Sequence, residues 1–163
     1  MTGQIILISG SRGAGKTTLC QQVIELARSQ GWNVSGILTL GDYVDGEKVS
    51  LYAQDVRTGE RRLLARRSYG GRYRWDFVEE TLAWGNSVFA SAIPTDLLVV
   101  DELGPLEWLD GRGWTAGLHA IDSREYRYAL VVTRPELVER ARARWPGFSW
   151  TMHLRRPSAG EGV

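Results

Sequence analysis

The feature that most constrains the fold of this chain is a glycine-rich segment between an apolar run and an amphipathic stretch. Residues 10–17 read GSRGAGKT and match the pattern G-x-x-x-x-G-K-[ST] at every position. The segment follows the apolar run 4–9, which is typical of a strand buried on both faces of a parallel sheet. It opens residues 15–30, where apolar positions recur at helical spacing. This strand–loop–helix context predicts a phosphate-binding loop.

Each residue type in this loop has a chemical reason. Glycines let consecutive backbone N–H groups turn inwards to form a concave anion site, and the following helix adds the positive end of its dipole. We expect Lys16 to reach the β- and γ-phosphates and the Thr17 hydroxyl to bind Mg²⁺. The residues predicted to hold the nucleotide are Gly10, Ser11, Arg12, Gly13, Ala14, Gly15, Lys16, Thr17 and Thr18.

A second motif follows the apolar run 97–100, which ends in two acids. The Asp101 carboxylate is expected to hold Mg²⁺ beside the phosphates. Glu102 is placed to polarise an attacking water as general base, and its alternative role is that of a capping acid. Residues 104–107 predict a tight turn that brings Glu107 back towards the nucleotide. Glu107 is then either a second acid near the metal or a structural carboxylate that fixes the turn.

Arg134 is a further catalytic candidate, because it follows the strand expected at residues 128–133. If that strand lies between the strands at 5–9 and 97–101, Thr133 and Arg134 stand beside the γ-phosphate. Arg134 can then stabilise transition-state charge from within the same chain. The alternative is that Arg134 only leads into the helix that Pro135 begins.

Along the whole chain, apolar runs alternate with helical stretches, which predicts an α/β fold. Strands are expected at 4–9, 32–39, 97–100, 128–133 and 148–154, and helices at 15–30, 75–92, 112–123 and 135–145. Right-handed crossovers between such strands give a three-layer sandwich around a mostly parallel sheet. Residues 41–66 predict an antiparallel hairpin appended to that sheet. We therefore expect one domain over residues 1–154 and a disordered tail over 155–163.

Composition excludes several other classes of protein. The chain is 43% hydrophobic and 24% charged, which is ordinary globular usage. Cys20 is the only cysteine and the two histidines are far apart, which excludes an internal disulfide and a local zinc motif. The first apolar run is too short for a signal peptide or a membrane span, so we expect a cytoplasmic protein with no membrane partner.

The charge distribution is uneven although the net charge is only +1. The Arg-rich segment, residues 57–74, holds seven arginines against the single acid Glu60. It has three interpretations: a solvated hairpin, a phosphate-facing lid like that of nucleotide kinases, or a nucleic-acid contact. In the third, the interleaved Tyr69, Tyr73 and Trp75 would stack on bases.

Several motifs together resemble a known family, the small nucleoside-triphosphatases first described from thermophiles. They are GSRGAGKTTL at 10–19, GILT at 36–39, LLAR at 63–66 and VVDELGPLEW at 99–108. The resemblance covers roughly residues 4–145 and implies Mg²⁺-dependent hydrolysis and a sheet like that of RecA-type ATPases. It implies phosphate and metal contacts for Lys16 and Thr17, a Mg²⁺ contact for Asp101 and water activation by Glu102. The stretch LGDYVDG after the second strand departs from the family pattern.

These observations predict Mg²⁺-dependent hydrolysis of ATP, GTP and other nucleoside triphosphates to diphosphate and phosphate. One alternative is a nucleoside or nucleotide kinase with the Arg-rich segment as its lid. Another is a nucleotide-gated module that binds nucleic acid or a protein partner. Glu102 favours hydrolysis, because a kinase needs a pocket for an acceptor hydroxyl and the sequence contains no sign of one.

Overall fold

The structure of the chain is a computed structural model that describes residues 2–11, 13–70, 74–147 and 150–155. Arg12, Arg72, Tyr73 and the tail from residue 156 onwards lie outside the described residues. Within these ranges the strands are β1 (Gln4–Gly10), β2 (Val34–Val44), β3 (Glu47–Asp55), β4 (Arg61–Arg67), β5 (Trp75–Phe77), β6 (Thr95–Leu103), β7 (Tyr126–Thr133) and β8 (Trp150–Leu154). The helices are α1 (Lys16–Ser29), α2 (Glu79–Ala90), α3 (Pro105–Trp108), α4 (Thr115–Ser123) and α5 (Val138–Arg144), with a 3₁₀ helix, η1, at Pro135–Leu137.

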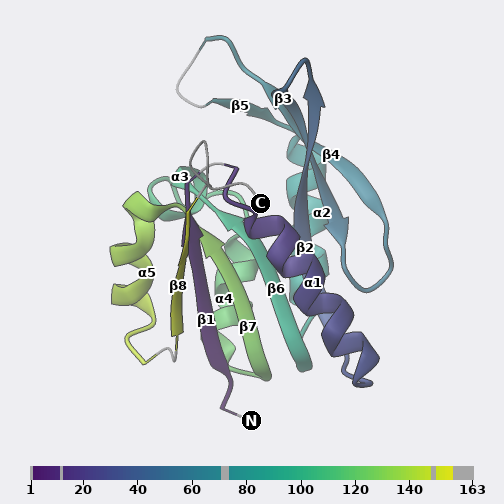
Figure 1. The fold of residues 1–163 in the computed structure, drawn as a ribbon, viewed down its shortest axis with the longest axis vertical. Coiled ribbons are helices and arrows are strands. Elements are labelled where there is room, and N and C mark those ends of the chain that lie inside the picture. The colour runs from purple at the N-terminus through teal and green to yellow at the C-terminus, as the bar shows by residue number, and fades with distance from the viewer. Residues whose placement is uncertain (1, 12, 71–73, 148–149, 156–163) are drawn as a thin grey trace, which may run out of the picture.

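The order of the strands brings the sequence motifs together. In the described part of the chain they form one eight-stranded sheet in the order β5-β4-β3-β2-β6-β7-β1-β8 (Figure 1). The pairs among β2, β6, β7, β1 and β8 are parallel, and β3, β4 and β5 extend the sheet from β2 in antiparallel pairs. β7 lies between β1 and β6, as the proposed role of Arg134 requires. The predicted α/β class, a mostly parallel sheet with appended antiparallel strands, is confirmed.

Helices cover both faces of the parallel part of the sheet, which gives the three layers. α1 lies on the face towards the viewer in Figure 1, where its Cys20 and Ile24 belong to one apolar cluster with Val99 of β6. α2 and α4 lie on the other face, where Phe89 and Trp114 meet edge-on with ring centroids 5.7 Å apart. No helix in the described ranges is long and apolar enough to cross a membrane.

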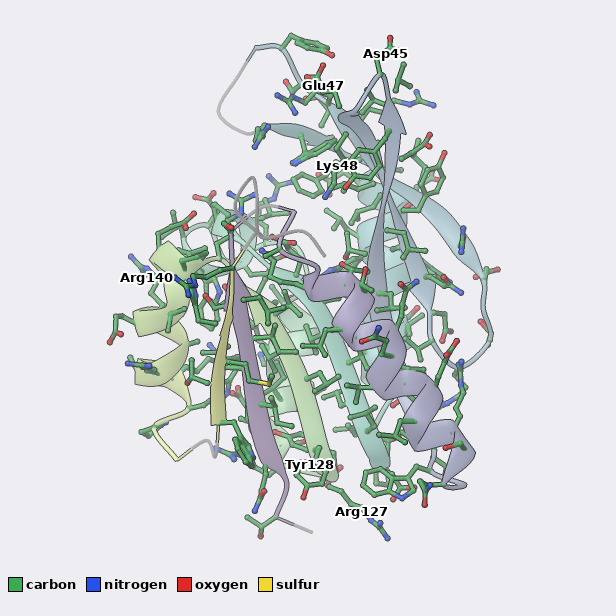
Figure 2. The ribbon with its side chains drawn as sticks, viewed as in Figure 1. Asp45, Glu47, Lys48, Arg127, Tyr128 and Arg140 are labelled. Carbon is green, nitrogen blue, oxygen red and sulfur yellow. The ribbon has the colours of Figure 1, made fainter. Side chains whose placement is uncertain are left out.

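The appended strands form an antiparallel arm, which consists of residues 41–44 of β2 together with β3, β4 and β5. β2 runs on to Val44, into the segment 41–66 that is expected to form the appended hairpin, and the turn between β2 and β3 consists of Asp45 and Gly46. Both turn residues have positive φ, 51° and 77°, as a tight hairpin between twisted strands requires. The arm rises beyond the carboxyl ends of the parallel strands (Figure 1), and Asp45 and Glu47 lie at its tip with Lys48 below them (Figure 2).

One expected helix begins later than predicted, and one expected turn is part of a short helix. The helix expected from residue 75 begins at Glu79, because residues 75–77 pair with β4 as β5. Trp75 and Phe77 pack against the core while Asp76 between them is exposed, which is the alternation of a strand. The turn expected at residues 104–107 is part of the short helix α3, which begins with proline at its first position.

β2 and β6 approach each other closely at Gly36. This residue has a φ of 113°, and a Cβ there would lie 2.0 Å from the carbonyl oxygen of Val99. Glycine is therefore required on two grounds, the left-handed backbone conformation and the close contact with a neighbouring backbone. Because Thr39 and Asp101 follow on these same two strands, the contact also sets the spacing of the site described below.

We predict that Gly36→Ala destabilises the protein by about 2–5 kcal/mol, since it adds backbone strain and forces β2 away from β6. Gly70→Ala is the matched control, because a Cβ at Gly70 meets nothing within 4 Å. The control should change the free energy of unfolding by no more than about 0.5 kcal/mol. Urea unfolding of both variants measures the difference, and equal stability of the two would contradict the prediction.

Candidate active site

The glycine-rich loop joins the end of β1 to the start of α1 at the carboxyl edge of the sheet. Gly13 and Gly15 have φ values of 78° and 91°, a conformation that side chains with a Cβ rarely adopt. Leu19 N–H donates to the carbonyl of Gly15 at 2.9 Å, and this bond closes the first helical turn. The N–H groups before Leu19 have no partner within the helix, so they are available to an anion above the loop.

Lys16 lies across this loop. Its Nζ donates to the carbonyl oxygen of Gly10 at 2.6 Å, which holds the ammonium group over the concave side of the loop. Gly10 itself lies against the edge strand β8, where a Cβ would come within 2.5 Å of the Leu154 carbonyl oxygen. The loop is therefore fixed at both ends, by β8 on one side and by α1 on the other.

Asp101 is the group around which the site is built. Its Oδ2 accepts hydrogen bonds from the Thr17 hydroxyl at 2.8 Å and from the Thr39 N–H at 3.1 Å. Asp101 is fully buried, and its Oδ1 has no hydrogen-bond partner among the described residues. Burial, reinforced by the negative charge of Glu102, raises the pKa of Asp101 to about 7. The bonds from Thr39 and Thr17 and the charge of Lys16 act in the opposite direction.

Asp101 and Thr17 fit the protein part of a Mg²⁺ site. Mg²⁺ prefers oxygen ligands and commonly binds through one or two protein oxygens, several waters and substrate phosphates. The unpartnered Oδ1 of Asp101 and the Thr17 hydroxyl supply oxygens of this kind next to the phosphate loop. In the described ranges there is no group of three or more His, Cys, Asp or Glu side chains that could hold a metal ion on its own.

Glu102 has an unusual backbone conformation. Its φ is 101°, and the pairing of β6 with β7 shifts register between Val100 and Leu103. A non-glycine residue in such a conformation typically costs about 1–3 kcal/mol and occurs most often at functional sites. The Glu102 side chain is 35% exposed, and its Oε1 lies 3.6 Å from Nε of Arg134 at the end of β7. The structure thus brings together the two side chains expected to face the γ-phosphate.

Glu107 lies in a different environment from the other acids. Its Oε1 accepts the Gly104 N–H at 2.9 Å and its Oε2 accepts the Trp114 N–H at 2.8 Å. Burial raises the pKa of Glu107 to about 7, although these backbone bonds oppose the shift. A carboxylate held by two backbone amides ties the turn after β6 to the start of α4. These contacts favour the structural alternative for Glu107 over the metal-binding one.

Thr39 and Thr133 also lie at the site, although the sequence predicted no role for either hydroxyl. The Thr39 hydroxyl donates to the backbone carbonyl of Asp101 at 2.5 Å, and the Thr133 hydroxyl donates to that of Leu103 at 2.7 Å. Both threonines are buried. Each is the polar residue that follows an apolar run, in GILT and in ALVVT, at the edge where the other motifs meet. That position is the signal in the sequence.

Two arginines of the Arg-rich segment, Arg62 and Arg67, contact neighbouring acids and an aromatic ring of α2. Arg62 lies 4.6 Å from the ring centroid of Trp84 and 3.4 Å from Glu60. Arg67 pairs with Glu47 of β3 at 3.7 Å. Acids and aromatic rings from neighbouring elements therefore offset part of the local positive charge. For these two side chains the contacts favour the solvated-hairpin interpretation.

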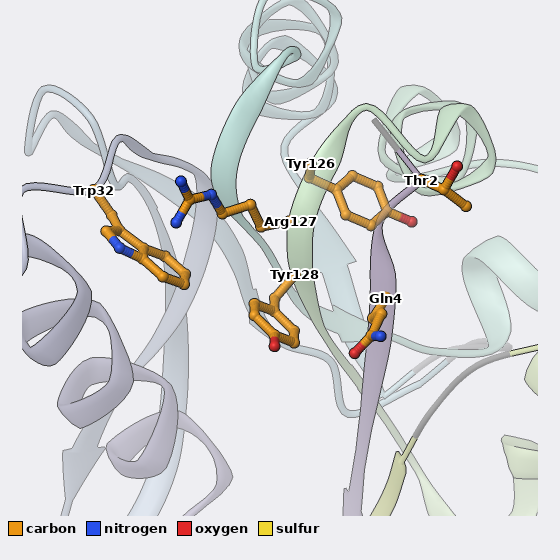
Figure 3. Close-up of a pocket in the computed structure, with 6 residues that line it drawn as sticks. All are labelled: Thr2, Gln4, Trp32, Tyr126, Arg127 and Tyr128. Carbon is orange, nitrogen blue, oxygen red and sulfur yellow. The ribbon is translucent and has the colours of Figure 1, made fainter.

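A shallow depression of about 380 Å³ lies at the opposite end of the sheet from the loop. Its lining residues are Thr2, Gln4, Trp32, Tyr126, Arg127 and Tyr128 (Figure 3). The Trp32 and Tyr128 rings are nearly parallel with centroids 6.0 Å apart, and Arg127 lies 4.8 Å from the Trp32 ring. The depression shares no residue with the loop site, and ligands of such sheets bind at the carboxyl ends of the strands.

Comparison with known proteins identifies relatives of the chain. The family model described as NTPase matches residues 5–144. Nucleoside-triphosphatase THEP1 of Methanopyrus kandleri is 32% identical over 106 residues, which are 63% of this chain and 58% of that protein. Nucleoside-triphosphatase THEP1 of Thermofilum pendens is 31% identical over 140 residues, which are 82% of this chain and 76% of that protein. The match thus spans less than two thirds of the length of the Methanopyrus relative.

Two solved structures are similar in fold. A human cancer-related nucleoside triphosphatase superposes with a TM-score of 0.65 at 20% identity, over 98% of this chain and 92% of that one. THEP1 from the hyperthermophile Aquifex aeolicus gives a TM-score of 0.64 at 17% identity, over 93% and 88%. At these identities the likeness shows the fold alone. Since the family model matches most of the chain, and its motifs resemble the small nucleoside-triphosphatases, the chain belongs to the NTPase family.

Proposed function

We propose that the chain is a Mg²⁺-dependent nucleoside-triphosphatase, which hydrolyses ATP, GTP and other nucleoside triphosphates to diphosphate and phosphate. The observation that carries the proposal is the 2.8 Å hydrogen bond between the Thr17 hydroxyl and Asp101, which joins the phosphate loop to the acidic strand. The names of the two THEP1 relatives support the same activity. We also propose that residues 1–154 act as a single domain, because loop, acids and arm all belong to one sheet.

The side chains have distinct roles in the proposed reaction. The loop amides and Lys16 bind the β- and γ-phosphates, and Thr17 and Asp101 hold Mg²⁺. Mg²⁺, when bound, neutralises charge on the phosphate oxygens. Glu102 accepts a proton from the attacking water, whose oxygen forms a bond to the γ-phosphorus as the bond to the β–γ bridging oxygen breaks. Arg134, 3.6 Å from Glu102, stabilises negative charge on the transferred group.

A kinase is the alternative, and the acceptor distinguishes the two activities. A hydrolase releases phosphate with water alone, whereas a kinase transfers it only to an added hydroxyl compound. Glu102 is partly exposed beside Arg134, which supports hydrolysis because its carboxylate can reach a water molecule. Phosphate release from a panel of nucleoside triphosphates with Mg²⁺, measured with and without added nucleosides, tests the proposal. Transfer to a nucleoside with no release in its absence would overturn it.

We predict that Lys16→Ala lowers phosphate release by about 10²–10³-fold, because the variant lacks the ammonium group that the structure places against the loop. The chain contains one other lysine, which supplies a matched control. Lys48 lies in the arm below its tip, with Nζ 5.7 Å from the Tyr43 ring centroid (Figure 2). Lys48→Ala should therefore keep the wild-type rate. An equal loss in both variants would indicate a general effect of charge instead.

We predict that Glu102→Gln lowers kcat by about 10²–10⁴-fold while nucleotide binding is retained, because the amide cannot accept the proton of the attacking water. Glu25→Gln, at an exposed position of α1, is the control and should leave kcat unchanged. Single-turnover hydrolysis and nucleotide titration separate the two effects. Full activity of Glu102→Gln would remove this residue from the mechanism.

We predict that Asp101→Asn is more stable than the wild type at pH 8 by about 1–3 kcal/mol in the absence of Mg²⁺ and nucleotide, although it loses Mg²⁺-dependent hydrolysis. The pKa of Asp101 is raised to about 7 in the folded chain, so the folded chain binds a proton that the unfolded chain releases near pH 4. Wild-type stability therefore falls as pH rises from about 4 to 7, and the variant lacks this contribution.

Denaturant unfolding of wild type and Asp101→Asn at pH 5 and pH 8 measures this difference. The stabilising effect of the substitution should be larger at pH 8 than at pH 5. Asp42→Asn is the control for loss of a carboxylate at an exposed position of the arm, and it should show no such change with pH. An Asp101→Asn variant that is less stable than wild type at pH 8 would contradict the assigned burial cost.

A further inference from the structure

Glu102 keeps its left-handed conformation at a point where regular strand pairing stops. The parallel pairing of β2 with β6 ends at the pair Ile37 and Val100, and Val100 directly precedes Asp101 and Glu102. The pairing of β7 with β6 shifts register between Val100 and Leu103. Neither ladder therefore fixes the backbone of Glu102 at its φ of 101°, and other contacts must hold it.

Two threonine hydroxyls supply these contacts from opposite sides. Thr39 of β2 donates to the carbonyl oxygen of Asp101, and Thr133 of β7 donates to the carbonyl oxygen of Leu103, at 2.5 and 2.7 Å. The acceptor carbonyls belong to the residues before and after Glu102 in the sequence. The Asp101 carbonyl is part of the peptide group that precedes Glu102, and the Leu103 carbonyl is part of the peptide group between Leu103 and Gly104. The chain is thus tied to β2 directly before Glu102 and to β7 one residue after it. We name this pair of bonds the threonine clamp.

Both ends of the clamp are anchored in the core. The Thr133 hydroxyl also accepts a hydrogen bond from Nε1 of Trp108 at 3.1 Å, and Trp108 packs edge-on against Trp145 with ring centroids 5.5 Å apart. Thr39 is opposite Ala53 in the antiparallel pairing of β2 with β3. The hydroxyl groups therefore have fixed positions, and a change of φ at Glu102 that is not compensated at the following dihedrals would break at least one of the two bonds.

We propose that Thr39 and Thr133 are positioning residues, whose hydroxyls hold the Glu102 backbone in the conformation that aims its carboxylate at the attacking water. The inference rests on the proposed hydrolysis. A change of φ at this residue would swing its Cβ, and the carboxylate with it, away from Arg134 at the end of β7. The two hydroxyls bond to backbone carbonyls of β6 and not to the phosphate loop, so the loop N–H groups and Lys16 keep their positions when a hydroxyl is removed.

Thr39→Val and Thr133→Val each remove one hydroxyl. Each should lower kcat by about 10–100-fold and leave KM within about twofold, because the base is misdirected while the loop is intact. Thr39→Ser and Thr133→Ser keep the hydroxyl and should retain most of the activity, although they lose a methyl group from the core. A structural role alone would make the serine variants no better than the valine ones.

The Glu102→Gln background shows whether the clamp acts through this residue. There the valine substitutions should cause no further loss of kcat, because the group that they position is already inactive. A loss by the same factor in both backgrounds would overturn the proposal. A rise in KM without a fall in kcat would overturn it as well, since it would assign the hydroxyls to nucleotide binding.

A melting experiment tests the clamp without using activity. Glu102→Gly relieves the strain of a positive φ and should raise the melting temperature by about 2–4 °C in the otherwise wild-type chain. In a chain that carries Thr39→Val and Thr133→Val, residue 102 is free to relax, so the same substitution should give no increase. If the double variant does not fold, each single valine variant serves, with a reduced increase expected.

An equal rise in melting temperature in clamped and unclamped chains would disprove the clamp. The same experiment separates this inference from the proposed function. If the wild type releases no phosphate from nucleoside triphosphates, the proposed hydrolysis fails, and so does the role of the clamp in it. The melting comparison then still decides whether the two hydroxyls hold the conformation of Glu102.

Discussion

The burial of the Asp101 carboxyl group is the constraint on which this end of the molecule depends. A carboxylate removed from water is costly unless every oxygen finds a donor or a metal ion. Here Oδ2 accepts two hydrogen bonds and Oδ1 accepts none from the described residues. The two donors come from α1 and β2, so the group links the phosphate loop to the strand beside it. The unpartnered Oδ1 is available to a metal ion, whereas in the protein without a ligand its burial lowers the stability of the fold.

Glu102, the next residue, carries an energetic cost in its backbone conformation, whereas Asp101 carries one in its buried side chain. Its positive φ costs conformational energy, and the Thr39 and Thr133 hydroxyls offset that cost through bonds to the carbonyls of the residues before and after it. A buried carboxyl group and a strained backbone conformation thus occur at two adjacent residues, Asp101 and Glu102. The well-packed clusters on both faces of the sheet provide the stability that tolerates them. The core residues thus supply the stability of the fold, and the residues at the carboxyl edge of the sheet supply the chemistry.

The sequence best predicts functional residues that lie together in one contiguous stretch of the chain. The loop at residues 10–17 and the pair Asp101–Glu102 carry their chemistry in local order, and each follows a strand that its apolar run reveals. Thr39 and Thr133 also end apolar runs, but the roles of their hydroxyls could not be predicted, because their acceptors depend on β2 and β7 being neighbours of β6 in the sheet. β5 was missed for another reason. Three residues are too few for periodicity to separate a strand from the first turn of a helix.

The Arg-rich segment shows why a charge count along the chain does not predict the field around the molecule. Seven arginines against one acid give a local charge of +6 in the sequence. In the sheet, Arg67 lies beside Glu47 of a neighbouring strand, and Arg62 lies over the Trp84 ring of α2. Strand pairing thus mixes segments of opposite charge, while the phosphate loop concentrates positive potential with one lysine and oriented N–H groups. Affinity for a polyanion in this fold therefore follows from local geometry and not from net charge.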